Sequence, residues 1–224
     1  MYLEQIDSPA DLKKLPPDAL CALAKEIREL IIDTVSENGG HLGANLGTVE
    51  LTIALHYIFD IPADLLVFDV GHQAYTHKIL TGRREFFRTL RRFGGCAGFP
   101  HPRESKFDAS VAGHAGTAIS TALGISTALG AASNPHKAIA VVGDGSLNCG
   151  ISLEGLNNAH AGGKNLIIIL NDNKMSISRN VGGLARSLNH IISGSFYNRF
   201  KTAAKRLLFS LPRHKTLHKM IRRF

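Results

Sequence analysis

The chain has 224 residues, of which 44% are hydrophobic and 20% are charged, as in a globular protein with an ample buried core. No apolar run approaches the roughly eighteen residues of a membrane-spanning helix, and residues 1–11 are acidic and lack a signal-like apolar segment. The composition therefore excludes a membrane protein and predicts a soluble, cytoplasmic one. The three cysteines, Cys21, Cys96 and Cys149, lack metal-binding or redox spacing and fit a reducing compartment.

Helical patterns dominate the N-terminal part of the sequence. One helix is predicted to begin at Pro16-Pro17-Asp18 and to end near Asn38-Gly39-Gly40, where left-handed backbone costs little. A second helix is expected over residues 48–59, because its apolar residues fall on one face. Residues 65–70 predict a short buried strand. Residues 83–93 predict an exposed helix because they carry several arginines: Arg84, Arg88, Arg91 and Arg92.

The second half of the sequence alternates strand and helix patterns. Residues 94–116 are rich in Gly, Pro, His and Ser and have no apolar period, which predicts a long loop, and such loops tend to be functional. A small-residue helix over 117–132 follows. A strand over 138–142, a helix over 151–161 and a strand over 166–170 then form a βαβ unit. This alternation predicts an α/β fold, a doubly wound parallel sheet with helices on both faces.

The formal net charge of +8 is concentrated at the C-terminal end of the sequence. Residues 199–224 hold nine of the 26 Lys and Arg residues and no acidic residue, so the rest has 17 basic and 18 acidic side chains. A basic tail can bind nucleic acid or an acidic membrane surface. Its apolar residues at loosely helical spacing favour instead an amphipathic helix that packs on further chain. We predict a globular domain over 1–198 and a basic helical tail over 199–224, without a nucleic acid as partner.

Two polar motifs directly follow the last two predicted strands. Gly143-Asp144-Gly145-Ser146 follows the first, and Asn171-Asp172-Asn173 follows the second. The carboxyl ends of neighbouring parallel strands meet at the edge where open α/β sheets bind ligands. Because hard oxygen donors hold Mg²⁺ beside phosphate, Asp144 and Asn173 predict a shared magnesium site. A lone Gly-Asp-Gly is commonly a simple turn, but its pairing with Asn173 favours the metal site.

Three further segments place a histidine beside glycine near the predicted ligand-binding edge. They are Gly39-Gly40-His41, Gly71-His72-Gln73 and Gly113-His114-Ala115, and the last leads into a helix, whose N-terminus favours phosphate. Zinc is the alternative use of several histidines, but their wide spacing and lack of Cys or Glu partners favour phosphate binding. His77 and His101 lack such a setting and are interpreted as structural. The hydroxyls of Ser146 and Thr117 suit either phosphate binding or helix capping.

Several strings of the sequence resemble 1-deoxy-D-xylulose-5-phosphate synthases, which are relatives of transketolase. Residues 71–84 read Gly-His-Gln-Ala-Tyr-Thr-His-Lys-Ile-Leu-Thr-Gly-Arg-Arg, and residues 171–178 read Asn-Asp-Asn-Lys-Met-Ser-Ile-Ser. Residues 46–52 and 155–159 agree with the same family, so the resemblance extends over nearly the whole chain. The Gly-Asp-Gly followed about thirty residues later by Asn also resembles the thiamine diphosphate motif. The resemblance implies a thiamine diphosphate-binding domain of the diphosphate type.

This resemblance implies an activity and assigns roles to residues. The family consists of transferases of the transketolase class that condense pyruvate with glyceraldehyde 3-phosphate, with loss of CO₂, in non-mevalonate isoprenoid synthesis. By resemblance, Asp144, Asn173 and the Met175 carbonyl hold Mg²⁺. Thiamine diphosphate contacts His72, Gly113, His114, Ala115, Gly145, Ser146 and Asn173. His41 and His72 are catalytic, because they face the reacting carbon, move protons and stabilise charge.

The resemblance also indicates what the sequence lacks. Family members continue into a pyrimidine-binding domain and a further domain, which hold the glutamate that activates the cofactor. We therefore expect this chain to be inactive alone and to act in a homodimer or with a complementary chain that carries the pyrimidine domain. The alternatives are an N-terminal subunit of a split enzyme and a non-catalytic remnant. At Ala115-Gly116 many relatives carry serines, so backbone N–H groups are expected to replace hydroxyl contacts there.

Overall fold

The computed structural model describes residues 1–111, 113–162, 165–172 and 183. The chain divides into two compact units, Met1–Arg179 and Asn180–Phe224. Of the second unit the structure describes only Gly183, so the fold reported is that of the first. The predicted boundary at residue 198 and the basic tail over 199–224 lie outside the described residues and stay predictions.

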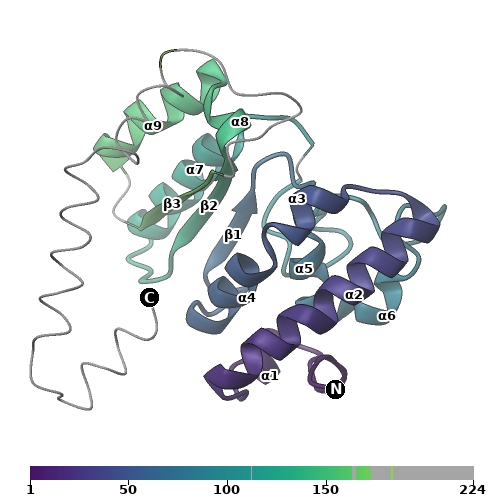
Figure 1. Cartoon of the computed structure of the whole chain (residues 1–224). Coiled ribbons are helices and arrows are strands. Elements are labelled where there is room, and N and C mark those ends of the chain that lie inside the picture. The colour runs from purple at the N-terminus through teal and green to yellow at the C-terminus, as the bar shows by residue number, and fades with distance from the viewer. Residues whose placement is uncertain (112, 163–164, 173–182, 184–224) are drawn as a thin grey trace, which may run out of the picture. The chain divides into compact units, whose positions relative to one another are not determined.

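The first unit consists of helices around a three-stranded sheet (Figure 1). Its elements in chain order are η1 (Leu3–Gln5), α1 (Pro9–Leu12), η2 (Pro17–Ala19), α2 (Leu20–Asn38), α3 (Leu42–Leu46), α4 (Val49–Ile58), β1 (Leu65–Phe68), α5 (Tyr75–Lys78), η3 (Ile79–Arg83), α6 (Arg84–Phe87), α7 (Ala118–Ala131), β2 (Ala138–Gly143), α8 (Asp144–Leu147), α9 (Gly150–Gly162) and β3 (Leu166–Asn171). No helix among the described residues is long and apolar enough to cross a membrane.

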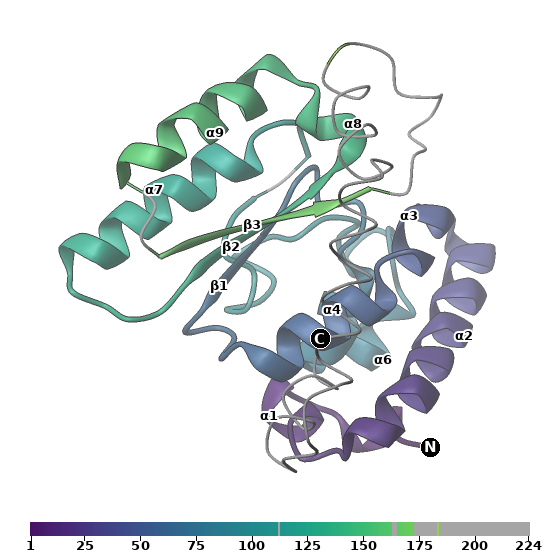
Figure 2. The same cartoon turned by 60° about the vertical axis from the view of Figure 1, so that its left-hand side comes forward.

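The sheet is parallel and has the order β1-β2-β3. On one face, α7 contacts all three strands and α9 packs against α7 (Figure 1). On the other face, Leu51 and Leu55 of α4 pack with strand residues that include Leu66, Phe68 and Val141, and Figure 2 shows α4 on the side opposite α7. The predicted α/β class, a parallel sheet with helices on both faces, is confirmed.

A second apolar core holds the helices outside the sheet together. Helix α2 buries Leu23, Ile27 and Ile31, which recur at the spacing of one helical face. These side chains pack in one cluster with Tyr75 and Leu80 from α5 and η3, and burying each side chain fully contributes about 1.5–3 kcal/mol. The segment between His72 and Arg83, which begins at a predicted catalytic histidine, is thereby fixed between two cores.

The helix predicted over residues 83–93 is shorter than expected, because α6 ends at Phe87. Arg91 adopts a φ of 61°, which a helix does not accept. The expected exposure is confirmed for Arg88, Arg91 and Arg92, and Arg84 is half-buried. Arg83, the last residue of η3, is instead 6% exposed, and its guanidinium is paired with carboxylates of the following loop. That loop, predicted over residues 94–116, contains no helix or strand among its described residues.

Candidate functional site

The carboxyl ends of β2 and β3 place two acidic side chains side by side. Gly143 at the end of β2 pairs in register with Asn171 at the end of β3, so Asp144 and Asp172 follow at the same edge. Burial raises the pKa of Asp144, and the neighbouring Asp172 carboxylate raises it further. The predicted adjacency of these two strands is confirmed. Asp172 was not predicted as part of the site, although it follows Asn171 in the same motif.

This pair of acidic side chains suits a hard cation. Two neighbouring carboxylates repel each other, and a divalent cation with oxygen ligands removes that repulsion. Asn173 and Met175, the other predicted ligands, lie outside the described residues, so the shared site of Asp144 and Asn173 stays a prediction. Among the residues that the structure describes, no group of three or more His, Cys, Asp or Glu is arranged to hold a metal.

Asp69, directly after β1, holds the N-terminus of α7. Its buried carboxylate accepts hydrogen bonds from the N–H groups of Gly116, at 2.8 Å, and Ala118, at 3.1 Å. A carboxylate is favourable at a helix N-terminus, so these two donors are already satisfied and are not free for a phosphate. Val70 follows with a φ of 59°, a strained conformation for a β-branched residue, and turns the chain toward His72.

The glycine-rich turn before α7 carries three of the predicted cofactor-binding residues. Gly113 and His114 are exposed and Ala115 is half-buried. The Nδ1 atom of His114 lies 3.1 Å from the carbonyl oxygen of Ala115, and the Thr117 hydroxyl donates to the His114 carbonyl. The Thr117 hydroxyl therefore stabilises its own turn and makes no side-chain capping hydrogen bond to α7, so the capping alternative is not confirmed.

The buried side chain of Ser152 connects this turn with the segment after β2. The Ser152 hydroxyl donates to the carbonyl of Ser146 at 2.8 Å and lies 3.4 Å from the carbonyl of Gly116. Ser152 thus contacts the predicted residue Ser146 and the residue that directly follows the predicted segment 113–115. Sequence reasoning missed Ser152, because nothing in its local pattern distinguishes it from any other serine on a helix.

The two predicted catalytic histidines lie next to each other. The ring centroids of His41 and His72 are 5.4 Å apart in an edge-to-face arrangement. Burial lowers the pKa of His72, and His41 lowers it further, whereas Asp69 opposes the change. The Nδ1 atom of His72 is buried and has no hydrogen-bond partner among the described residues. A neutral ring with an unsatisfied nitrogen is suited to exchange a proton with a bound ligand.

Asn45 fixes the backbone at both histidines. Its buried amide nitrogen donates to the carbonyl of His41 at 2.6 Å and to the carbonyl of His72 at 2.7 Å. Its side-chain oxygen accepts from the N–H of Tyr75 at 2.9 Å. The N–H of His41 in turn donates to the Tyr75 hydroxyl at 3.2 Å. Sequence reasoning missed Asn45, since only the fold brings residues 41 and 72 together.

The sequence matches proteins of a known family over almost its whole length. A family model described as 1-deoxy-D-xylulose-5-phosphate synthase matches residues 3–224. The chain belongs to the 1-deoxy-D-xylulose-5-phosphate synthase family. The resemblance of the motifs at 71–84 and 171–178 is thereby confirmed, and the carboxyl edge with Asp144 lies in a synthase-family domain.

Individual relatives show how much of such a synthase this chain represents. It is 54% identical over 211 residues to the 1-deoxy-D-xylulose-5-phosphate synthase of Anaeromyxobacter dehalogenans, which covers 94% of this chain and 33% of that protein. It is 52% identical over 210 residues to synthase 1 of Geobacter sulfurreducens, with the same coverages. A crystal structure of a transketolase mutant from Pichia stipitis matches with a TM-score of 0.61 and 26% identity, over 69% of this chain and 27% of that one. The chain thus spans about a third of the length of the curated relatives.

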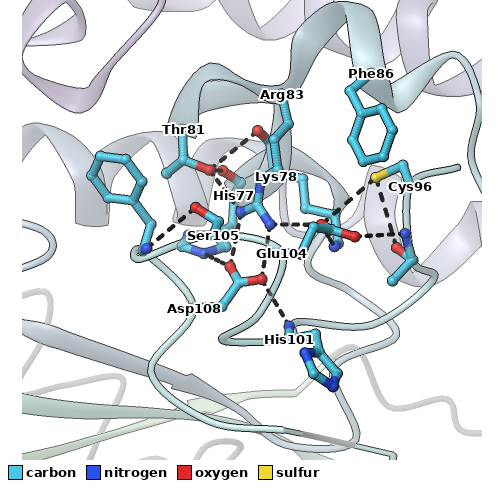
Figure 3. Close-up of polar contacts among 12 residues, drawn as sticks. His77, Lys78, Thr81, Arg83, Phe86, Cys96, His101, Glu104, Ser105 and Asp108 are labelled. Carbon is cyan, nitrogen blue, oxygen red and sulfur yellow. Dashed lines mark hydrogen bonds and ion pairs between the residues drawn. The ribbon is translucent and has the colours of Figure 1, made fainter. Parts of the chain in front are cut away.

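A buried network of charged and imidazole side chains joins α5 and η3 to the following loop in this synthase-family domain (Figure 3). Arg83 donates to both oxygens of Asp108 at 2.8 Å and to Glu104 at 2.8 Å, and Lys78 also pairs with Glu104. His77, interpreted from the sequence as structural, lies 2.9 Å from Asp108 through Nε2. Through its other ring nitrogen, His77 lies 2.9 Å from a second buried histidine, His56.

Proposed function

We propose that this chain is the part of a 1-deoxy-D-xylulose-5-phosphate synthase that binds thiamine diphosphate and Mg²⁺. The observation that carries the proposal is the edge after β2, where Asp144 lies beside Asp172 and Ser152 connects Gly116 with Ser146. Family membership supports the same assignment. The unsatisfied nitrogen of His72 is a feature that a polar ligand would satisfy, and the adjacent oxygen-bearing side chains of Asp144 and Asp172 suit a hard cation.

In this proposal each segment has a defined task. Asp144 holds Mg²⁺ together with Asn173 and the Met175 carbonyl, and the metal in turn binds the diphosphate. The segments 113–115 and 145–146 bind the diphosphate through backbone N–H groups and the Ser146 hydroxyl. Many relatives carry serines at 115 and 116, whose hydroxyls this chain lacks. The N–H of Gly116 is already bonded to Asp69, so backbone N–H groups earlier in the turn take over those hydrogen bonds in this proposal.

The histidine pair supplies proton transfer at the reacting group. Thiamine diphosphate, when bound, supplies the carbanion chemistry, and the protein positions it. His72 is kept mostly neutral at neutral pH because burial lowers its pKa, so the ring can accept or donate a proton. His41, at a ring distance of 5.4 Å, is placed to stabilise charge on the substrate oxygen. Both residues act on the substrate in this proposal.

These 224 residues correspond to about a third of the length of the curated synthases. The synthase reaction condenses pyruvate with glyceraldehyde 3-phosphate and releases CO₂, but the chain spans about a third of its relatives. We expect the chain to be inactive alone and to need a homodimer or a complementary chain that supplies the pyrimidine domain. The cytoplasmic location stays a prediction, which the free thiols of Cys21, Cys96 and Cys149 support.

Calorimetric titration of the 224-residue chain with thiamine diphosphate and Mg²⁺ tests this proposal. We expect binding that depends on Mg²⁺ and an affinity at least about tenfold lower for Asp144→Ala, a change of about 1.4 kcal/mol. Asp33→Ala is the matched control, because Asp33 is an exposed carboxylate on α2 and should leave the affinity unchanged. Equal affinity of Asp144→Ala and wild type would contradict the metal role. Absence of any binding would favour the non-catalytic remnant.

A further inference from the structure

The long loop after α6 carries an aromatic ring to the histidine pair. Phe99 is half-buried, and its ring centroid lies 6.1 Å from that of His41. Two residues before Phe99, the N–H of Ala97 donates to Glu104 at 2.7 Å. Two residues after it, the N–H of His101 donates to Asp108 at 2.8 Å. The segment 97–101 is therefore held at both ends by carboxylates of its own loop.

Those two carboxylates are fixed to the segment formed by α5 and η3. Lys78 and Arg83 pair with Glu104, and Arg83 and His77 bind Asp108 (Figure 3). The side chains of Lys78 and Asp108 are fully buried, and buried charges persist in proteins only when they are paired. The loop is therefore joined to the core by ion pairs and hydrogen bonds, which fix its position more narrowly than apolar packing alone would.

The same helical segment also contacts the backbone of His41. Tyr75, the first residue of α5, accepts a hydrogen bond from the N–H of His41 and donates its own N–H to Asn45. One face of this segment thus fixes the His41 backbone, and its polar side chains fix the loop that brings Phe99 to the His41 ring. The restraint on the His41 backbone and the restraint on its ring therefore both originate from residues 75–83.

We propose that Glu104 and Asp108 are positioning residues of the candidate active site, which hold Phe99 against His41 and so orient the His41 ring toward His72. Neither carboxylate touches the substrate. The inference rests on the proposed function, because only that function gives the orientation of His41 a chemical purpose. Its physical content is nevertheless independent of any ligand, since the contacts are present in the protein by itself.

Histidine ring resonances of the 224-residue chain, observed by NMR and assigned with His41→Gln, report the position of Phe99 directly. Phe99→Leu removes the ring, and we expect the His41 ring protons to shift toward their values in an unstructured peptide. Phe99→Tyr keeps the ring and is expected to leave them in place. Glu104→Gln is expected to move the His41 signals in the same direction as Phe99→Leu, because the loop is released. Glu85→Gln, an exposed carboxylate paired with Arg84, is the matched control and should change nothing at His41.

Amide hydrogen exchange on the wild-type chain gives a test that needs no variant. The N–H groups of Ala97 and His101 are expected to exchange at least about a hundredfold more slowly than in an unstructured peptide. Exchange of both at the peptide rate would overturn the proposal, as would His41 signals that are unchanged by Phe99→Leu or by a folded Glu104→Gln. None of these measurements contains thiamine diphosphate. If the proposed function is wrong, calorimetry shows no binding while the NMR signals still show the Phe99 contact with His41. If the positioning role is wrong, calorimetry shows binding while the His41 signals do not respond to Phe99→Leu or Glu104→Gln.

Discussion

At the scale of single residues, the histidine pair depends on one buried carboxamide. Asn45 uses its amide nitrogen twice as a donor and its oxygen once as an acceptor, and these bonds join His41 to a distant segment that holds both His72 and Tyr75. Buried polar groups without partners cost about 1–3 kcal/mol each, so removing this side chain leaves several backbone groups unsatisfied. The network stabilises the fold and sets the spacing between His41 and His72 with the same hydrogen bonds.

Asn45→Ala is therefore expected to lower the free energy of unfolding by about 2 kcal/mol or more. Asn45→Asp, which keeps the shape but loses both donors at neutral pH, is expected to be at least as destabilising. Asn158→Ala is the matched control, because Asn158 donates to a carbonyl from the exposed face of α9 and should cost less than about 0.5 kcal/mol. Urea unfolding monitored by circular dichroism measures all three. A midpoint for Asn45→Ala equal to that of the control would refute the role of Asn45.

At the scale of elements, the sequence predicted the three described strands and the longer helices α2, α4, α7 and α9, because their apolar periodicity is local, whereas short helices such as α3, α5 and α8 were missed. The predicted ranges 48–59, 117–132 and 166–170 correspond to α4, α7 and β3 within one or two residues at each end. The helix predicted over 83–93 ends early, at Phe87, because the N–H of Arg91 donates to the carbonyl of Cys96 at 2.8 Å and does not continue the helix. The burial of Arg83 was not predicted either, because no local pattern encodes its partners Asp108 and Glu104.

The candidate site was predictable only where its residues lie in motifs. Asp144 directly follows β2, and His72 lies four residues after β1, so their place at the edge of the sheet followed from the strand pattern. Asp69 directly follows β1 and had the same signal. Asn45 and Ser152 act through contacts between distant segments and have no signal in the sequence itself.

The N-terminus of α7 has a steric requirement that substitution can test. Gly116 has a φ of +91°, and an added Cβ would lie 2.5 Å from Ile151 Cγ2 and 2.9 Å from Cys149 Cβ. Gly116→Ala is therefore expected to destabilise the chain by about 1–3 kcal/mol and to push the turn at 113–115 away from α8 and α9. Gly124 lies within α7 and has open space around an added Cβ. Gly124→Ala should therefore stabilise the folded chain by about 0.5–1 kcal/mol. Thermal unfolding distinguishes the two, and equal signs would contradict the steric argument.

At the scale of the whole molecule, the buried polar network joins the sheet side of the fold to the long loop. His56 comes from α4, which packs on the sheet. His77 comes from α5, and the centroid of its ring lies 5.4 Å from that of Phe68 on β1. Asp108 then connects His77 to the loop. Protonation of a histidine in this network therefore affects contacts among α4, α5 and the long loop. Its effect should appear in the free energy of unfolding of the whole domain.

Stability is expected to fall as the pH falls below about 6.5. Burial lowers the pKa of His56 to about 3, with His77 as the next cause, and burial also lowers the pKa of His77. The unfolded chain therefore binds more protons than the folded one between about pH 3 and 6.5, so acid favours unfolding. His56 alone should cost about 2 kcal/mol between pH 7.5 and pH 5. Urea unfolding at both pH values should show a smaller difference for His56→Gln than for wild type. His160→Gln, at an exposed position of α9 outside the network, should retain the wild-type difference. An unchanged pH dependence in His56→Gln would mean that this imidazole is not held neutral by the fold.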